Sequence, residues 1–429
     1  MEIALIIIFV IGYAAIAFEH TIKINKTAPA ILIGAIMWSL WAIYDHGEIL
    51  EINSELNLEL ASIAQILFFL MGAMTIVELI DAHQGFKIIT NRITTRNARK
   101  LLWILSFITF FLSALLDNLT TAIVMVSLLR KLVHDKEQRW FYSGMVVVAA
   151  NAGGAWSPIG DVTTTMLWIG GQISSMNIMK TLIIPSLVCM IVPLVVVGFQ
   201  LKGEVHGEAI DPDKAEKDEK VKGSMLMLVL GIGALVFVPV FKTVTHLPPY
   251  MGMLLGLAVV WIVSELLHID KTEEEKKPYT AIHALTRIDV SSILFFLGIL
   301  LAIGTLQGTG VLGHLAAWMD TTIGNKDLIA MCIGLLSAVV DNVPIVAATM
   351  KMYPLADYPL DSKIWEFIAY AAGTGGSCLI IGSAAGVAVM GMEKMDFMWY
   401  LKKISWLAFI GYIAGAIAYM IVYPVFAVH

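Results

Sequence analysis

Apolar segments of membrane-spanning length alternate with short polar segments along almost the whole chain. Apolar runs of 16 to 24 residues recur from end to end. A helix needs about 20 consecutive apolar residues to cross a bilayer, and in hydrocarbon it must satisfy its own backbone polar groups. The pattern therefore predicts an all-α, polytopic membrane protein. The expected spans are residues 3–18, 27–44, 58–80, 177–200, 224–241, 250–267, 291–306 and 404–424.

Two other pairs of apolar segments are separated by a polar tip. The first pair is 101–116 with 119–133, and the second is 328–340 with 344–353. Each arm is short for a comfortable crossing, so each pair is predicted to be a re-entrant helical hairpin that enters the membrane and returns.

Two longer apolar segments, 140–173 and 364–391, are interrupted in the middle. In the first, three glycines and a proline fall within ten residues between Asn151 and Asp161, so a helix cannot continue and backbone carbonyls are freed. A bound cation can satisfy such carbonyls at membrane depth. The alternative is a proline kink whose carbonyls are satisfied by neighbouring serines and threonines.

The two halves of the chain repeat the same motifs in the same order, at offsets between 222 and 227 residues. The pairs are Ile66-Leu-Phe-Phe-Leu70 with Ile293-Leu-Phe-Phe-Leu297, Ser-Ala-Leu-Leu-Asp117-Asn118 with Ser-Ala-Val-Val-Asp341-Asn342, and Asn151-Ala-Gly-Gly154 with Gly373-Thr-Gly-Gly376. An internal duplication is therefore predicted. The expected parts are a first transmembrane repeat (1–201), a charged linker (202–222) and a second transmembrane repeat (223–429).

Loop charge predicts the orientation. Residues 45–60 carry five acids and no Lys or Arg, whereas 81–100 and 130–139 are rich in Lys and Arg. Under the positive-inside rule the two basic loops are cytoplasmic, so both ends of the first hairpin lie on one side. With five spans and one hairpin per half, the second repeat is expected to be inverted. Both termini are then expected outside, the linker in the cytoplasm and the protein in the cell inner membrane.

Composition agrees with this class and excludes others. The chain is 58% hydrophobic and 14% charged, and it lacks the clustered basic residues of a nucleic-acid-binding protein. Its three cysteines, Cys189, Cys332 and Cys378, have no metal-ligand spacing and are expected to be free thiols.

Acidic side chains at membrane depth are the candidate chemistry. Asp117 and Asp341 stand at the two hairpin tips, and Asp161 ends the first glycine-rich break. A carboxylate there costs at least a few kcal/mol, so a functional role is the default hypothesis. Asp-Asn is also an ordinary helix cap, but Asn or Ser would cap without a buried charge. Further candidates are Ser113, Ser157 and Glu78, of which Glu78 is close enough to the end of its span to reach water.

The tip Leu-Asp117-Asn118-Leu-Thr-Thr-Ala, the break from Asn151 to Asp161 and the second tip Asp341-Asn342-Val-Pro344 resemble the NhaD-type sodium/proton antiporters. These belong to the ion-transporter superfamily that also contains sodium/dicarboxylate symporters and arsenite permeases. The resemblance covers essentially the whole chain and implies two inverted repeats with broken helices meeting at the midplane. It implies a cation and proton site at Asp117, Asn118, Thr120, Asn151, Asp161, Thr163, Thr164, Asp341, Asn342, Ser377 and Ser383. Ser383 stands where the first repeat has Asp161, so the two half-sites are expected to differ.

Exchange of Na⁺ or Li⁺ for H⁺ is the expected function, because the tips carry Asp where the symporters of this superfamily typically carry Ser. Negative charge there repels a dicarboxylate, and a proton and a cation can compete for one carboxylate. A sodium-coupled anion symporter or an arsenite permease is the main alternative. The chain lacks the Gly-x-Gly-Asp motif of an intramembrane protease, and it lacks the nucleotide-binding motif that a primary pump needs. The expected partners are membrane lipid and monovalent cations, without a cofactor or nucleic acid, and a homodimer is left open.

Overall fold

Helices make up almost all of the chain that the computed structural model describes, which is residues 1–429 without 18, 46–48, 91–92, 94, 202, 206–220, 340 and 427–429. The one β-bridge in this part joins Asn97 to Glu204. Most of the predicted linker, 202–222, lies outside the described residues. The prediction of an all-α protein is therefore confirmed.

The first half contains α1 (Glu2–Ala17), α2 (Glu19–Ile22), α3 (Thr27–Tyr44), α4 (Ile49–Ala82), α5 (Lys87–Thr90), α6 (Ala98–Ser113), α7 (Asn118–Leu132), α8 (Lys136–Ala155), α9 (Val162–Ile169) and α10 (Ser175–Gln200). The second contains α12 (Ser224–Thr245), α13 (Pro249–Leu267), α14 (Glu273–Lys276), η2 (Lys277–Tyr279), α15 (Ala281–Arg287), α16 (Val290–Gly308), α17 (Val311–Thr322), α18 (Lys326–Leu336), α19 (Asn342–Met352), α20 (Lys363–Gly375), α21 (Ala384–Glu393), α22 (Phe397–Tyr400), η3 (Leu401–Ser405) and α23 (Trp406–Phe426).

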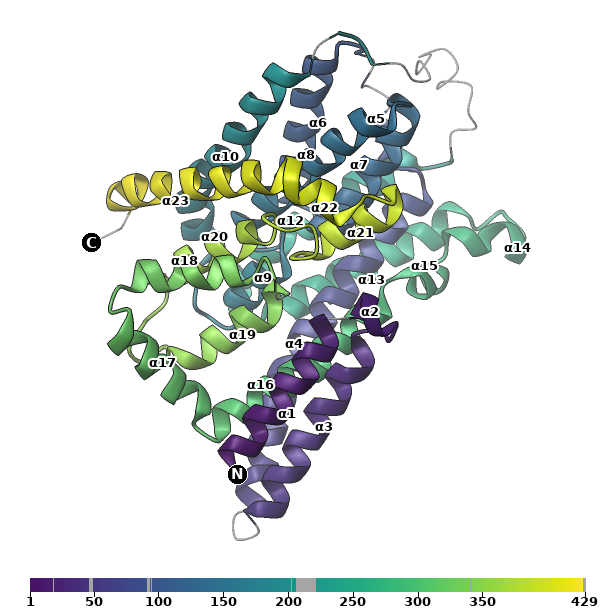
Figure 1. Cartoon of the computed structure of the whole chain (residues 1–429). Coiled ribbons are helices and arrows are strands. Elements are labelled where there is room, and N and C mark those ends of the chain that lie inside the picture. The colour runs from purple at the N-terminus through teal and green to yellow at the C-terminus, as the bar shows by residue number, and fades with distance from the viewer. Residues whose placement is uncertain are drawn as a thin grey trace.

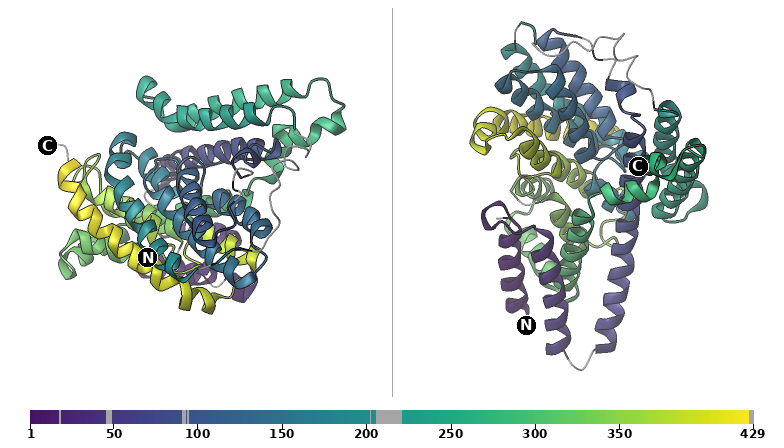
Figure 2. Two further views of the ribbon diagram at one scale, coloured as in Figure 1. Left: turned by 90° about the horizontal axis from the view of Figure 1, so that it is seen from above. Right: turned by 90° about the vertical axis from the view of Figure 1, so that its right-hand side faces the viewer.

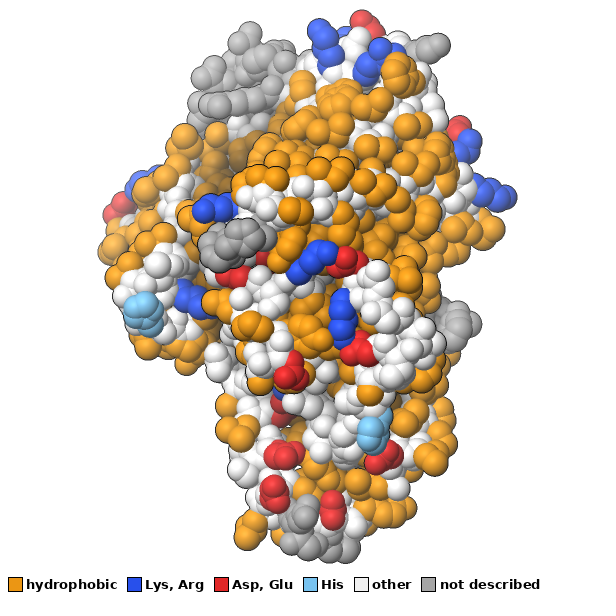
Figure 3. All heavy atoms as spheres, turned by 90° about the vertical axis from the view of Figure 1, so that its left-hand side faces the viewer, with side chains coloured by type: hydrophobic (Ala, Val, Ile, Leu, Met, Phe, Trp, Pro, Cys, Tyr) orange, Lys and Arg blue, Asp and Glu red, His pale blue; other side chains and the backbone are white. Residues whose placement is uncertain are grey.

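Within the described residues, seven helical segments are long and apolar enough to cross a membrane. They are Thr27–Tyr44, Ile49–Ala82, Ser175–Gln200, Ser224–Thr245, Pro249–Leu267, Val290–Gly308 and Phe397–Phe426. The chain is a multi-pass membrane protein, as its apolar pattern predicts. Wide apolar areas cover the face shown in Figure 3. Among the exposed apolar side chains of the molecule, Ile11 and Phe199 are about two-thirds exposed. In a membrane such a surface contacts lipid.

The helices form two groups, which we call the framework group and the core group. The framework group consists of α1, α3, α4, α12, α13 and α16, and α3 packs along α16. The core group consists of α6 to α10, α18 to α21 and α23, and α10 packs along α23. Figures 1 and 2 show α23 crossing the molecule at a steep angle to α4. Elements of the core group therefore supply both hairpins and both breaks.

The predicted boundaries hold for most helices, with one clear correction at the start of α4. Residues 45–60 were expected as an acidic loop before a span at 58–80, but α4 already begins at Ile49. Glu51, Glu55 and Glu59 are spaced by four residues and so follow one face of this helix. Glu59 also pairs with Lys351 at 2.7 Å, which gives its charge a partner.

Two helices flank each predicted tip, and each longer apolar segment is broken where the sequence predicts it; we keep the name hairpin for each pair of flanking helices. The first hairpin is α6 with α7 and the second is α18 with α19. The first broken helix is α8 with α9 and the second is α20 with α21, and irregular backbone separates the two parts of each.

Each hairpin packs against the broken helix of its own half in the same way. A Cβ added at Gly160 would lie 2.5 Å from the Ser113 carbonyl oxygen, and one at Gly382 would lie 2.5 Å from that of Ala338. Real Cβ atoms do not approach so closely, so only glycine lets the break reach the hairpin. The two halves thus share local packing as well as sequence motifs.

Candidate functional site

Asp117 forms the tip of the first hairpin and caps α7. Its Oδ1 accepts a hydrogen bond from the Thr120 amide nitrogen at 2.8 Å, and its Oδ2 accepts one from the Thr120 hydroxyl at 2.6 Å. These bonds satisfy an amide that has no partner within the helix and hold the carboxylate in one orientation. The Asp117 side chain remains half-buried, in contact with a pocket described below.

Asp161 lies where the two hairpin tips meet. Its Oδ1 caps α9 by accepting a hydrogen bond from the Thr163 amide nitrogen at 3.2 Å. Its Oδ2 accepts from the side-chain amides of Asn118 and Asn342, each at 3.4 Å. Asp161 is only 2% exposed. One buried carboxylate therefore receives donors from both halves of the chain.

Asn151 extends this network to the second broken helix. Its Oδ1 accepts a hydrogen bond from Asn118 at 3.1 Å, and its Nδ2 donates to the hydroxyls of Ser377 and Ser383 at 2.9 Å each. Since Ser383 also caps α21, it occupies in the second half the position that Asp161 occupies in the first. The two half-sites are structurally matched but differ by one carboxylate.

Threonine hydroxyls beside Asp161 differ in their availability. The Thr163 hydroxyl is buried with no hydrogen-bond partner within ordinary geometric limits. The Thr164 hydroxyl donates weakly to the Ala155 carbonyl at 3.5 Å, across the break in the first broken helix. Thr163 therefore offers a neutral oxygen within reach of the buried carboxylate, whereas Thr164 helps to join α9 to the end of α8.

Asp341, at the second tip, is placed differently from Asp117. Its Oδ1 accepts a 3.3 Å hydrogen bond from the Val343 amide nitrogen, and its Oδ2 is paired with the Lys26 ammonium at 2.8 Å. Lys26 is not among the residues that the sequence predicts for the site, because a lysine at the end of an apolar segment is typical of an ordinary membrane interface. No motif connects it with Asp341, which is 315 positions away.

The three additional candidates have structural partners. Ser113 donates to the Ala150 carbonyl at 2.6 Å, and Ser157 donates to the Ala114 carbonyl at 2.5 Å. Both hydroxyls hold the first hairpin against the first broken helix. Glu78 pairs with Arg287 at 2.7 Å and has no described contact with the Asp161 network. The structure therefore does not bring Glu78 into the site.

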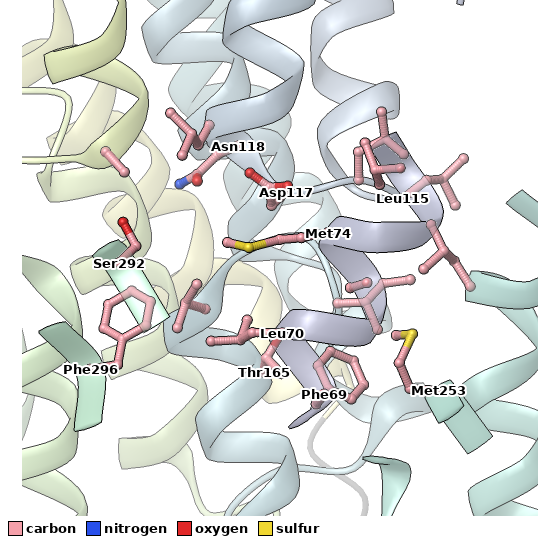
Figure 4. A pocket seen from close by; sticks show the side chains of 18 residues that line it. Phe69, Leu70, Met74, Leu115, Asp117, Asn118, Thr165, Met253, Ser292 and Phe296 are labelled. Atoms are coloured by element: carbon pink, nitrogen blue, oxygen red, sulfur yellow. The ribbon is translucent and has the colours of Figure 1, made fainter. Parts of the chain in front are cut away.

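A pocket opens beside the first tip, between the core and framework groups. It is lined mainly by apolar side chains, including Leu70 and Met74 of α4 and Phe296 of α16. Figure 4 shows the Asp117 carboxylate and the Asn118 side chain above Met74, on the side of the pocket opposite Phe296. The first tip therefore borders a mainly apolar pocket, to which Asp161 does not contribute.

The donor set fits a hard monovalent cation. It combines the Asp161 carboxylate with neighbouring hydroxyl oxygens such as that of Thr163, and oxygen donors suit hard cations. Among the described residues, no group of three or more His, Cys, Asp and Glu side chains is placed to hold a metal ion. Asp161 is the one buried carboxylate at its centre, and in ionised form it would carry the charge of a site for one monovalent cation.

Comparison with known proteins places the chain among transporters. Residues 13–363 match the family described as citrate transporter (CitMHS). The chain is 52% identical over 425 residues to sodium/proton antiporter 1 of Arabidopsis thaliana, an alignment that covers 98% of this chain and 73% of that protein. It is 48% identical to sodium/proton antiporter 2 of the same plant, covering 97% and 99%. The Na⁺/H⁺ antiporter NhaD of Alkalimonas amylolytica is 29% identical, covering 96% and 88%.

Proposed function

Since this multi-pass membrane protein belongs to the NhaD-type sodium/proton antiporters, within the citrate transporter family, we propose that it exchanges Na⁺ for H⁺ across its membrane. Li⁺, which has the same charge and prefers the same oxygen donors, is expected as a second substrate. The protein is a secondary transporter and not an enzyme.

The observation that carries the proposal is the placement of Asp161. A buried carboxylate contacted by Asn118, Asn342 and the Thr163 amide nitrogen can be neutralised either by a proton or by Na⁺. Because an unneutralised charge is costly at this depth, release of one cation favours uptake of the other. Competition for a single site, exposed alternately to the two sides, is sufficient for exchange.

In this mechanism the neighbouring polar groups have separate roles. The Thr163 hydroxyl and the amide oxygens of Asn118 and Asn342 supply neutral ligands to Na⁺ after the amides rotate. Asn151 holds the Asn118 amide and the two serine hydroxyls in register. Asp117, which borders the pocket, attracts cations toward the tip and is the second carboxylate that can carry a proton.

A citrate-type anion is the second candidate substrate, because the matched family carries that description. The charges argue against it. Asp117 has no cationic partner among the described residues, and it lies beside Asn118, which contacts Asp161. Two neighbouring carboxylates would repel a multivalent anion by several kcal/mol at a low effective dielectric constant. The same charges attract Na⁺.

The matched packing of the two halves supports an inverted-repeat architecture. We propose that the hairpin and broken helix of each half enter from opposite sides and meet at Asp161 and Asn151. The loop charges favour termini outside, the linker in the cytoplasm and location in the cell inner membrane. The working cycle is alternating access to the site from the two sides.

The decisive experiment uses purified protein in lipid vesicles containing a pH-sensitive dye. With an imposed pH gradient, addition of Na⁺ or Li⁺ is expected to move protons, while K⁺ and empty vesicles give the control signal. Citrate added with Na⁺ should produce neither uptake of citrate nor a change in the proton signal. Citrate-dependent Na⁺ uptake without proton counter-movement would replace the antiporter with a symporter.

A further inference from the structure

Lys26 is held in a fixed position at the start of α3. The Thr27 hydroxyl donates to the Ser291 carbonyl at 2.9 Å, and Asn25 accepts from the Ser291 hydroxyl at 3.1 Å, which fixes this end of α3 against α16. One turn further along α16, the Phe295 ring lies 4.3 Å from the Lys26 ammonium. A cation over an aromatic face is attracted to it. The framework group thus presents one ammonium in a defined place.

That ammonium is directed at the second hairpin tip of the core group. It contacts Asp341 Oδ2 at 2.8 Å, and both side chains are largely shielded, with 27% of Lys26 and 17% of Asp341 exposed. Glu19 and Asp289 also lie within electrostatic range of Lys26. Asp289, however, already caps α16 through Ser292, so Asp341 is the direct partner.

The equivalent carboxylate of the first half has no such partner. Asp117 is contacted by the amide and hydroxyl of Thr120, and no Lys, Arg or His among the described residues pairs with it. The two tips therefore share the Asp-Asn pair and the capping role but differ in their partners. The carboxyl group of Asp117 has no basic partner among the described residues, whereas that of Asp341 is paired with an ammonium.

We propose that Lys26 is a resident counter-cation that occupies the cation position of the second tip, so that exchange takes place only at Asp161 and the first tip. This inference rests on the proposed function and specifies it further. An ammonium attached to the protein is at a high effective concentration and is not released, so Na⁺ from solution competes poorly for Asp341. Lys26 thereby sets how many cations the duplicated site can hold.

The proposal predicts opposite effects for the two halves of the ion pair. Lys26→Met frees the Asp341 carboxylate, which can then bind a second Na⁺ or a proton. The Hill coefficient for Na⁺ should rise, and the pH profile of exchange should gain a second step. Asp341→Asn instead leaves an unpaired ammonium beside the site, which should raise the apparent Na⁺ constant about tenfold, equivalent to about 1.4 kcal/mol.

The combination Lys26→Met with Asp341→Asn is the critical test, because it restores a neutral pair. It should recover most of the Na⁺ affinity that Asp341→Asn alone loses. Lys26→Arg keeps the charge and should keep the wild-type Na⁺ and pH dependence. Lys23→Met, which removes an exposed positive charge three residues away, is the matched control and should have no effect.

All variants are measured in vesicles of the same lipid, with the amount of folded protein determined for each. If Lys26→Met lowers only that amount and leaves the Na⁺ and pH dependence unchanged, Lys26 is structural and the inference is overturned. Equal loss of exchange in Asp341→Asn and in the double variant would also overturn it. If Lys26→Met alone fails to fold, the comparison of Asp341→Asn with the double variant decides whether Lys26 has the proposed role. A wild-type protein that moves no protons on addition of Na⁺ would instead overturn the proposed function.

Discussion

The side-chain amide of Asn151 donates a 2.9 Å hydrogen bond to the hydroxyl of Ser377, which joins the first broken helix to the second. The two residues are 226 positions apart and come from different halves of the chain. A single amide thus connects the elements that carry the candidate cation site. Substitution of Asn151 and of Ser377, alone and together, therefore measures the energetic coupling between the two halves.

Removal of this bond should weaken Na⁺ binding in a non-additive way. Asn151→Ala and Ser377→Ala are each expected to raise the apparent Na⁺ constant several-fold, since either change releases part of one network. The double variant should be less impaired than the product of the two single effects, because contacting residues are coupled. Exchange rates measured over a range of Na⁺ concentrations give all four constants. Fully multiplicative effects would contradict a shared network.

Close packing of the hairpins should make one glycine intolerant of substitution. Gly382→Ala would place a Cβ 2.5 Å from the Ala338 carbonyl oxygen, so the break must move away from the hairpin. We expect loss of exchange and a lower melting temperature in detergent. Gly391→Ala is the control, because a Cβ there meets nothing within 4 Å and alanine favours a helix by up to about 1 kcal/mol. Equal stability of the two variants would refute the packing argument.

Much of this fold follows from the sequence because membrane helices are specified by length and polarity. α3 spans the predicted 27–44, and both breaks occur where glycine and proline prevent a continuous helix. The Asp-Asn pairs also allow a capping role, the alternative to ion binding in the sequence analysis, and Asp117 and Asp341 do cap their helices. Local rules suffice where the determining interaction is local.

Other features depend on which helices contact one another, and the sequence alone does not specify that. The acidic start of α4 reads as a loop until Lys351 supplies a partner for Glu59. Helix α17 was not predicted, because its mixed residues resemble a connection between spans. The pairing of Lys26 with Asp341 requires α3 and the second tip to be neighbours. Tertiary packing decides each of these cases.

The direction in which the first hairpin enters the membrane can be tested by labelling. After Cys332, the exposed native cysteine, is replaced by serine, single cysteines are placed at Lys100, Lys136 and Glu51. Lys100, in the first turn of α6, and Lys136, the first residue of α8, lie among basic residues at the two ends of the hairpin and should react from the cytoplasmic side, whereas Glu51 should react from outside. A membrane-impermeant maleimide applied to oriented vesicles reports the side. If the cysteines at positions 100 and 136 react from opposite sides, α6 and α7 do not form a re-entrant hairpin. The argument that the second repeat is inverted would then fail.

Stability should fall at acidic pH because of a histidine pair beyond the ends of α4 and α13. His268 Nε2 lies 3.1 Å from His83 Nε2, and the His268 ring stacks on Tyr279 with centroids 4.2 Å apart. Burial, aided by the nearby Lys271, lowers the pKa of His268 to about 4 from its ordinary value of 6.5. The neutral ring is therefore favoured in the folded state. The contribution of the neutral His268 ring to the free energy of unfolding is fully present above about pH 6.5 and is lost as the pH falls toward about 4.

The change that tests this is His268→Phe, which keeps a ring against Tyr279 but cannot be protonated. The melting temperature of the wild-type protein should drop between about pH 7 and about pH 4.5, and the variant should show a smaller drop. His134→Phe changes an exposed histidine and serves as the control. The same pH dependence in all three proteins would assign the acid sensitivity to other groups.

Removal of the charged carboxylate and removal of a neutral hydroxyl at the Asp161 site should produce different defects in exchange. Thr163→Ala removes one neutral ligand among several, so it should mainly raise the apparent Na⁺ constant, by about tenfold or about 1.4 kcal/mol. Asp161→Asn keeps the cap on α9, because asparagine also accepts from the Thr163 amide nitrogen, but it removes the charge that Na⁺ and H⁺ share. It should abolish most exchange and shift the pH profile of what remains.

The measurement is the pH dependence of exchange at saturating Na⁺, with Thr165→Ala as control, since that hydroxyl is bonded to the Pro158 carbonyl at 3.0 Å. An unchanged profile with weaker Na⁺ binding would make Asp161 a plain cation ligand, and no change in either property would make it a helix cap alone.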